Sequence, residues 1–285
     1  MSSKSGDSKQ PCSKAVCDSR SLPSGNETTS LNNPAACPYG ECDGSEIIIT
    51  ADENGIQVAK PCRCSELRIM KNKLKFANIP AEFENLTIKS FSTDMYDAEE
   101  SIIIARNIKK IAIQFVKRFE EMKQSGKGLY LFGETKGSGK TRMAVSIGNA
   151  LISQCNADVK FVTTLNLIEE IKSTWDNIDK RDSGKTQSKL LAAIKEIEVL
   201  ILDDFGTEKP TSWVNEIFYN ILNDRMTANK ITIFTSNCRI ESLRHDERIV
   251  NRLPKMAIPI GFPEESIRTA LAQSENEEIL KSFLG

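Results

Sequence analysis

The chain has 285 residues, 39% of them hydrophobic, which is enough for one large globular domain or two smaller ones. Its 38 lysines and arginines balance 39 aspartates and glutamates, so the formal net charge of -1 excludes the overall basic field of a wholly basic nucleic-acid-binding protein. The single histidine, His245, excludes a catalytic histidine pair and a histidine-rich metal site. Any transition-metal site must therefore use sulfur or carboxylate ligands, and six of the eight cysteines lie in the first 64 residues.

The first 66 residues divide into a polar stretch and a short β-type module. Residues 1–34 are rich in serine, asparagine and proline and poor in large apolar side chains, a composition that predicts a disordered tail. Residues 35–66 contain two β-type runs, 47–50 and 56–58, separated by Asp-Glu-Asn-Gly, and Asn-Gly is a strong hairpin signal. We therefore expect a small β-hairpin module after the tail.

Four cysteines lie at the two ends of this predicted hairpin: Cys37, Cys42, Cys62 and Cys64. A tetrahedral zinc site of four thiolates would hold together a module that is too small to fold around its own core. The spacing differs from the usual Cys-x-x-Cys knuckle at both ends, so free thiols in a mobile arm are the alternative. Cys12 and Cys17 repeat the four-residue gap, but they belong to the predicted tail.

Residues 67–96 are expected to form a linker, and residues 97–285 the second domain. A helix predicted over 97–124 carries an apolar stripe at steps of three and four residues, made of Ile104, Ile108, Ile111, Phe115, Phe119 and Met122. Glycines at 126 and 128 should end this helix.

Strands and helices then alternate along the chain. Apolar strands are predicted at 129–132, 160–164, 199–202 and 231–235, and the intervening helices at 141–153, 165–175, 187–197 and 213–226. This alternation predicts the α/β class, with a parallel sheet covered by helices on both faces. Beyond Asn237 the pattern is helical, and it ends with helices expected at 264–273 and 277–283.

A glycine-rich loop joins the first of these strands to its helix, in the run Gly-Glu-Thr-Lys-Gly-Ser-Gly-Lys-Thr. Glycines let backbone N–H groups turn toward phosphate oxygens, the lysine can reach the β- and γ-phosphates, and the threonine hydroxyl can bind Mg²⁺. This Walker A pattern assigns ATP binding to Gly133, Lys136, Gly137, Ser138, Gly139, Lys140 and Thr141. The pattern G-x-x-x-x-G-K-[ST] expects glycine at Glu134, so either the loop is one residue longer or Glu134 points away from the phosphates.

Two carboxylates follow the apolar strand predicted at 199–202. Asp203 and Asp204 should emerge at the carboxyl edge of the sheet, where open α/β folds bind ligands. There Asp203 would hold Mg²⁺ through water, and Asp204 would orient the attacking water or accept its proton. Asn237 follows the strand at 231–235, which would place its amide where it could position the water between the γ-phosphate and Asp204.

Three arginines complete a set of candidate γ-phosphate ligands. Arg248 and Arg252 are four residues apart in a predicted helix, and Arg268 lies on a later helix. A guanidinium group suits this role because it stays charged and binds phosphate with two donors. Any one of these arginines, taken alone, fits a solvated surface better, and only the set in this order favours the phosphate role.

Residues from about 78 to the end resemble the AAA+ ATPases of the DnaC/DnaI helicase-loader family, including its phage-encoded members and the related IstB ATPases. Gly-Ser-Gly-Lys-Thr, Leu-Asp-Asp-Phe-Gly, Phe-Thr-Ser-Asn and Arg-Ile-Val-Asn-Arg-Leu, in this order, carry the resemblance. It implies that Asn237 is sensor 1, that Arg252 is an arginine finger offered to a neighbouring subunit's ATP, and that Arg268 is sensor 2. It also implies that residues 79–91, the lead-in segment, lie near the adenine.

The resemblance further implies an ATP- and Mg²⁺-dependent loader that self-associates through its ATP interface and places a hexameric replicative helicase on single-stranded DNA. Loaders that resemble DnaI often carry an N-terminal zinc-binding domain that grips the helicase. An IstB-like ATPase that serves a transposase is the alternative, and so is a nucleotide-gated adaptor with little hydrolysis. The adaptor is suggested by Asp204, which is one methylene shorter than the glutamate common in AAA+ ATPases, and by Glu134 in the phosphate loop.

The interval 165–198 is locally basic because of Lys172, Lys180, Arg181, Lys185 and Lys189. Interleaved aspartates leave a single-stranded DNA contact and an ordinary solvated loop as equal alternatives. The chain shows no signal peptide and no window apolar enough for a membrane span. We therefore expect a protein of the cytoplasm of a bacterial cell or a phage-infected host, with no membrane contact.

Overall fold

The computed structural model describes residues 37–51, 56–176 and 191–284. The chain forms two compact units, Met1–Cys64 and Ser65–Gly285. The predicted tail, the hairpin turn at 52–55 and the basic residues 180–189 lie outside the described residues.

The first unit contains the predicted hairpin. Strands β1 (Ile47–Ala51) and β2 (Gln57–Pro61) pair antiparallel, with Ile47 opposite Pro61 and Ala51 opposite Gln57. Apart from the half-buried Ile48, every residue of the two strands is exposed. The buried side chains of this unit are instead Cys62 and Cys64. Among the described residues, the hairpin therefore has no apolar core, and the cysteine cluster described below is the source of stability that these residues offer.

The second unit is built on five parallel strands, and this confirms the predicted fold class. In space their order is β4-β5-β6-β3-β7. Their bounds are β3 (Gly128–Phe132), β4 (Val159–Thr163), β5 (Val199–Asp203), β6 (Ile231–Ser236) and β7 (Ala257–Gly261). Because β6 lies between β3 and β5, the residues that follow β6 are adjacent to both the glycine-rich loop and the paired aspartates.

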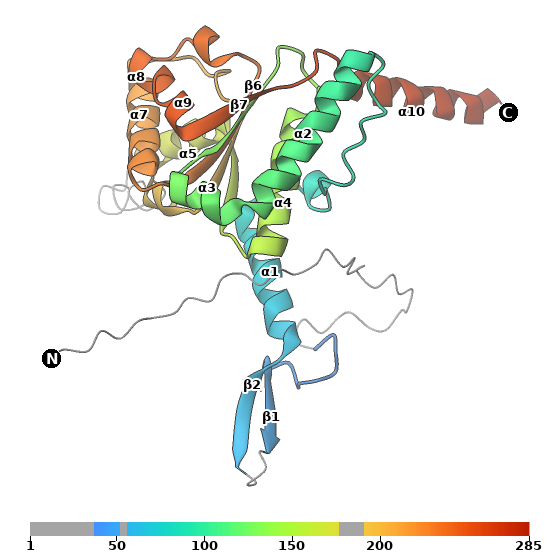
Figure 1. Ribbon diagram of the computed structural model, residues 1–285, viewed down its shortest axis with the longest axis vertical. Helices are drawn as coiled ribbons and strands as arrows, with labels where there is room; N and C mark the ends of the chain where they lie inside the picture. Colours follow the sequence, from blue (N-terminus) through green and yellow to red (C-terminus); the bar gives the residue numbers. More distant parts are fainter. Residues whose placement is uncertain (1–36, 52–55, 177–190, 285) are drawn as a thin grey trace. The chain divides into compact units, whose positions relative to one another are not determined.

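Alternate residues of the strands face two separate cores. Leu129, Leu131 and Ile201 belong to the core beneath helices α2 and α4, whereas Tyr130 and Leu202 belong to the core beneath α5 and α7. Figure 1 shows α2 and α4 side by side, with α7 across the sheet from them. Both faces are apolar because a parallel sheet covered by helices on both sides has no solvated face.

The helices flank this sheet in chain order. They are α1 (Arg63–Ala77), α2 (Glu99–Lys117), α3 (Phe119–Ser125), α4 (Lys140–Cys155), α5 (Thr164–Asp176), α7 (Ser212–Thr227), α8 (Glu247–Val250), α9 (Leu253–Met256) and α10 (Ile267–Leu284), with short 3₁₀ turns at Ala81–Phe83 and Ile240–Ser242. Residues 191–196 are also helical and form the described part of the helix predicted at 187–197. Gly126 ends α3 in the left-handed region, with φ of 64°, as the sequence predicted.

Several predicted elements differ in detail. The helix predicted over 97–124 breaks at Arg118, and Ile111 is 39% exposed because the buried stripe runs through Ala112 instead. Residues 267–284 form one helix, not two. Arg248 and Arg252 do not share a helix, because α8 ends at Val250 and Arg252 lies in the turn before α9.

Strand β7 was missed because helix was expected over its residues. It carries Pro259, which cannot donate a ladder hydrogen bond, but β7 is an edge strand that pairs with β3 alone in the described sheet. Among the described residues, no helix is long and apolar enough to span a membrane.

Candidate functional site

The glycine-rich loop runs from the end of β3 to the first residue of α4. Gly137 and Gly139 have φ of 81° and 94°, values that residues with a side chain rarely adopt. The ammonium of Lys140 donates to the carbonyl oxygens of Gly133 and Thr135, both at 2.9 Å, and to Ser138 Oγ at 3.3 Å. The loop therefore curls around its own lysine.

These contacts favour one of the two alternatives given for Glu134, a loop that is one residue longer than the Walker A pattern. Gly133 still donates its N–H to Ser236 of β6, so the sheet ladder continues through this glycine. Glu134 comes next as an added residue, and its side chain is exposed. The alternative that these contacts support is therefore a loop one residue longer than the pattern, with the side chain of the added residue exposed to solvent.

Lys140 is 5% exposed, and this burial lowers the pKa of its ammonium group. The nearby carboxylates of Glu264, Asp204 and Asp203 act in the opposite direction. A triphosphate at this loop would add negative charge beside the lysine and favour its charged form further.

Asp203 ends β5 and joins the loop to β6. Its Oδ1 accepts hydrogen bonds from Thr141 Oγ1 at 2.8 Å and from Thr235 Oγ1 at 2.6 Å. Burial raises the pKa of Asp203, although both hydroxyl donors act to lower it. A carboxylate and a threonine hydroxyl in contact are the oxygen ligands that P-loop proteins offer to Mg²⁺, so this pair fits the ion.

Asp204 turns away from this pair toward Asn237. Its backbone has φ of 55°, in the left-handed region, and its N–H donates to Thr235 Oγ1 at 2.9 Å. The amide of Asn237 lies 3.5 Å from Asp204 Oδ1. The two side chains that were predicted to position a water therefore lie next to each other.

A cavity of about 460 Å³ opens over the loop. It is lined by Phe83, Lys136, Gly137, Ser138, Gly139, Lys140, Thr141, Arg142, Leu165, Asp204, Thr207, Asn237, Ile267 and Arg268. Nine of these residues were predicted for the site. Phe83 belongs to the lead-in segment, which the resemblance placed near the adenine, whereas Arg142, Leu165, Thr207 and Ile267 were not predicted because no motif marks them.

Arg268 reaches the loop from the first turn of α10. Its backbone N–H lies 3.3 Å from the carbonyl oxygen of Gly137. A Cβ at Gly137 would lie 2.7 Å from Ser266 Oγ and 2.9 Å from the Cβ of Arg268. Only glycine therefore allows α10 to approach the loop this closely, and the approach places Arg268 at the cavity.

Arg252 lies away from this cavity. Its guanidinium group donates to Asn223 Oδ1 at 3.0 Å and to the Tyr219 hydroxyl at 2.9 Å, and it lies 4.3 Å from the centre of the Tyr219 ring. Arg248 lies over the same ring at 4.8 Å and pairs with Asp246. An arginine finger acts on another subunit's ATP, so a position outside its own subunit's cavity is compatible with that role.

The lead-in segment also packs against the loop, since a Cβ at Gly139 would lie 3.0 Å from the ring of Phe91. The hydroxyl of Tyr96, beyond its end, donates to the carbonyl oxygen of Ser138 at 2.8 Å, and burial raises the pKa of Tyr96 to about 12. Asn149 on α4 holds the segment through three carbonyl oxygens, those of Phe83, Glu84 and Leu86. Neither Tyr96 nor Asn149 belongs to a motif, so sequence reasoning missed both.

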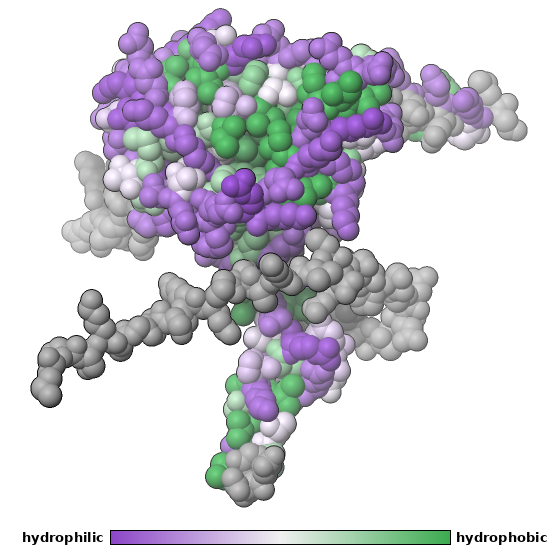
Figure 2. All heavy atoms as spheres, in the orientation of Figure 1, coloured by the Kyte–Doolittle hydropathy of each residue, from purple (hydrophilic) through white to green (hydrophobic). Residues whose placement is uncertain are grey.

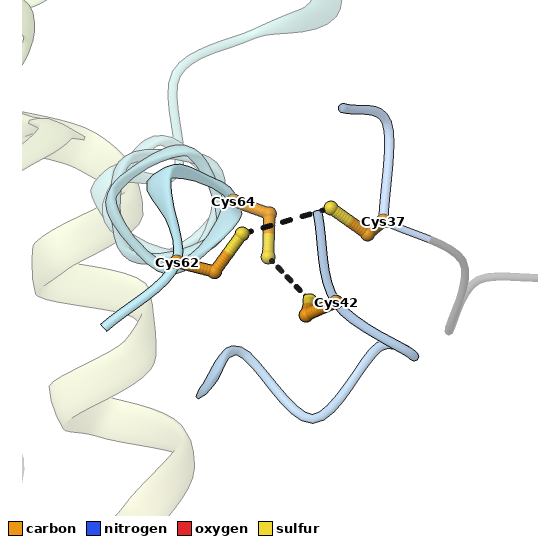
Figure 3. Close-up of side chains that lie close together, drawn as sticks. All are labelled: Cys37, Cys42, Cys62 and Cys64. Atoms are coloured by element: carbon orange, nitrogen blue, oxygen red, sulfur yellow. Dashed lines mark hydrogen bonds between the residues drawn. The ribbon is translucent and has the colours of Figure 1, made fainter. Parts of the chain in front are cut away.

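The four predicted cysteines converge in the first unit (Figure 3). Their sulfur atoms all lie within 4.8 Å of one another, with Cys37 3.7 Å from Cys62 and Cys42 3.4 Å from Cys64. Zinc binds thiolate sulfur at about 2.3 Å, so a tetrahedral site needs sulfur atoms roughly 3.8 Å apart, and the cluster fits this ion.

The cysteine cluster also has uneven thiol acidity. Desolvation acts to raise the pKa of Cys37, but hydrogen bonds from the backbone of Cys42, Tyr39 and Glu41 together lower it to about 6. The pKa of Cys64 is raised by desolvation and by the neighbouring thiols. One thiol of the cluster is therefore ready to lose its proton, and a cation would favour ionisation of the others.

Comparison with known proteins identifies the family. Residues 64–249, more than half of the chain, match the model of the IstB-like ATP binding proteins. The chain belongs to this family. As an IstB-like protein, it is an ATP-binding protein. Its glycine-rich loop and its paired aspartates lie within the matched region.

The relatives of this IstB-like protein include a named helicase loader and two proteins with other names. It is 31% identical over 169 residues to the replicative helicase loader DnaI of Bacillus subtilis, covering 54% of this chain and 51% of the relative. It is 26% identical over 210 residues to the phage-like element PBSX protein XkdC of the same organism, covering 72% and 74%. A further Bacillus subtilis relative, the uncharacterized protein YqaM, is 26% identical over 205 residues, covering 70% and 61%. The chain thus spans about three fifths of YqaM and half of DnaI.

Solved structures agree with this assignment. A crystal structure of DnaI aligns with 65% of this chain and 95% of its own, with a TM-score of 0.53 and 29% identity. A crystal structure of the DnaC helicase loader aligns with 64% and 99%, with a TM-score of 0.53 and 24% identity, and supports the fold alone. The predicted resemblance to the DnaC/DnaI and IstB group is confirmed.

Proposed function

We propose that this IstB-like protein is an ATP-dependent loader that places a hexameric replicative helicase on single-stranded DNA during DNA replication. The observation that carries the proposal is the shared cavity: residues of the Walker A loop, Asp204, Asn237 and Arg268 line it together, in a chain whose relatives include named helicase loaders. The site would bind and hydrolyse ATP, with hydrolysis weak until a partner stimulates it.

Each site residue has a proposed role. The loop N–H groups and Lys140 hold the phosphates, and Thr141 with Asp203 holds Mg²⁺, which would neutralise charge on the phosphates. Asp204 and Asn237 position the attacking water, and Arg268 contacts the γ-phosphate. Arg252 would complete the site of a neighbouring subunit, so that ATP favours self-association.

The first unit is proposed to bind the helicase. The four cysteines would hold zinc, which would stabilise a hairpin that has no apolar core. The exposed side chains of this hairpin include Ile47, Ile49, Ile56 and Val58, which are 37% to 66% exposed. Figure 2 shows hydrophobic residues on the surface of this hairpin, interspersed with hydrophilic ones. Exposed apolar groups on so small a module favour contact with a partner protein.

Single-stranded DNA is the proposed second partner, and the cytoplasm of a bacterial cell or a phage-infected host is the proposed location. The proposed DNA contact includes Lys180, Arg181 and Lys185. Replacing these three residues with alanine should weaken binding of a labelled single-stranded oligonucleotide. Unchanged binding would remove this loop from the proposal.

Co-sedimentation with a purified hexameric replicative helicase tests the main proposal. We expect association that depends on ATP and that is lost in the Lys140→Ala variant. A parallel capture experiment with an IS21-type transposase addresses the alternative. If the protein bound the transposase and not the helicase, the loader function would be wrong, although ATP binding would stand.

A further inference from the structure

The carboxylate of Glu264, a residue that belongs to none of the motifs described above, binds the backbone of the phosphate loop. Glu264 lies just before α10, and its two oxygens accept the backbone N–H groups of Glu134 at 3.0 Å and Thr135 at 2.8 Å. The carboxylate therefore binds the loop with one oxygen for each N–H group. These donors belong to the part of the loop that departs from the usual glycine spacing.

The extra residue of the phosphate loop explains why a carboxylate bound to the loop backbone is needed. A loop with the usual spacing has four residues between its first glycine and the glycine before the lysine, whereas five residues separate Gly133 from Gly139 here. Here the added peptide unit carries one more N–H group and more conformational freedom. Glu264 provides acceptors for the N–H groups at this point and thereby restricts the first part of the loop.

The carboxylate also acts on the lysine of the loop. Glu264 is the first of the three carboxylates that offset the effect of burial on the pKa of Lys140. In the reverse direction, desolvation acts to raise the pKa of Glu264, but the hydrogen bonds from Thr135 and Glu134, with the charge of Lys140, bring it below its usual value. Glu264 is therefore ionised at neutral pH, as two N–H donors require.

We infer that Glu264 is a positioning residue that holds the lengthened phosphate loop in the shape that binds ATP. Its two oxygens are bonded to backbone N–H groups of the loop, and it is not among the residues that line the cavity, so we assign it no contact with the phosphates. Its attachment to the chain four residues before Arg268 means that one short segment places both the loop and this arginine. The inference rests on ATP binding by the loop and does not depend on the identity of any partner.

The next residue, Glu265, is a matched control. Its carboxylate also accepts two neighbouring backbone N–H groups, those of Asp97 at 2.8 Å and Ala98 at 3.2 Å, but these lie at the start of α2 and not in the phosphate loop. Replacement of either glutamate by glutamine removes a charge and weakens two hydrogen bonds of the same type. A general loss of stability would therefore be shared by both variants.

Binding of a fluorescent ATP analogue to the full chain tests the inference. We expect Glu264→Ala and Glu264→Gln each to raise the Kd by about tenfold, because a charged acceptor for two N–H groups is lost. Glu265→Gln should leave the Kd within about twofold, while its melting temperature falls about as much as that of Glu264→Gln. At saturating ATP, kcat of Glu264→Gln should stay near the wild-type value, so that the defect lies in binding.

Deletion of Glu134 supplies the second test. This deletion restores the usual glycine spacing, so Glu264→Gln should then change the Kd by less than about twofold. The inference is wrong if Glu264→Ala binds the analogue like the wild type, or if Glu265→Gln weakens binding equally. Wild-type protein that failed to bind the analogue would overturn both this inference and the proposed function. Loss of helicase association with intact ATP binding would overturn the loader proposal alone.

Discussion

Asp203 and Asp204 are neighbours in the sequence, yet the fold gives them different environments. Asp203 is 5% exposed and is held by two threonine hydroxyls, whereas Asp204 lies at the cavity in a left-handed turn. A fixed, hydroxyl-bonded carboxylate suits a metal ligand, and a carboxylate that faces the cavity suits a group that handles water. The two environments therefore support separate roles.

The Asp204→Asn variant separates hydrolysis from binding. Asparagine tolerates the left-handed backbone, so the turn should be kept while the proton acceptor is lost. We expect kcat for ATP hydrolysis to fall by roughly 100-fold with little change in the Kd for ATP. Steady-state phosphate release and analogue binding measure the two quantities. If the wild type hydrolysed ATP no faster than this variant, the protein would be a nucleotide-gated adaptor.

Motif residues were predictable because their chemistry depends on short spacings within the chain. The residues that support them were not. Tyr96, Asn149 and Glu264 each act on backbone groups more than 40 residues away, so nothing in their local sequence marks them. The sequence assigned His245 no structural role, because its being the single histidine served only to exclude histidine-based sites. The structure shows that it is buried, with its ring nitrogens bonded to Glu208 and Asn215.

Arg225 is a further residue that only the fold reveals. It is fully buried, its guanidinium group bonds the carbonyl oxygens of Ile194, Ile197 and Ile231, and burial lowers its pKa to about 9. Arg225→Met should lower the free energy of unfolding by about 3 kcal/mol, because these buried carbonyl groups lose their donor. Urea denaturation measures this change, and Arg248→Met is an exposed control. A loss below about 1 kcal/mol would mean that water replaces the guanidinium group.

At the scale of whole elements, periodicity and composition predicted four of the five sheet strands. Each of these four ends within two residues of its predicted bound, because continuous apolar runs between glycines and polar residues have few other structures. Strand β7 was not predicted, because a short run that contains Pro259 gives no strand signal in the sequence. Proline is compatible with a strand at the sheet edge, but the sequence does not show which strand lies there. The break at Arg118 was missed because an apolar stripe continues through it.

The hairpin element is predicted to depend on its metal. Purified protein should contain about one zinc ion per chain, and Cys42→Ser with Cys64→Ser should abolish it. Because the strands bury almost nothing, loss of the ion should unfold the hairpin and expose β1 and β2 to proteolysis. Limited proteolysis with and without a chelator measures this, and Cys155→Ser is the control. Equal protection in metal-free protein would show that the thiols suffice.

At the scale of the whole molecule, the chain has two compact units with separate chemistry. The cysteine cluster lies entirely in the first unit, and the nucleotide cavity lies entirely in the second. Removal of zinc by a chelator, followed by restoration of Mg²⁺, is therefore expected to leave ATP binding intact, while it removes association with the helicase. An ATP-binding defect in chelated protein would show that the two units depend on each other.

Assembly determines whether one ATP site is complete. Arg252 lies outside its own subunit's cavity, so the Arg252→Ala variant should bind ATP normally and fail to hydrolyse it. Asp204→Asn should also be inactive, but for a different reason.

In a head-to-tail assembly, mixing the two variants creates interfaces that combine an intact Asp204 from one subunit with an intact Arg252 from the next. An equimolar mixture should therefore regain activity at about a quarter of its interfaces. If the mixture stayed inactive at protein concentrations where the wild type self-associates, Arg252 would not act on a neighbouring subunit's ATP.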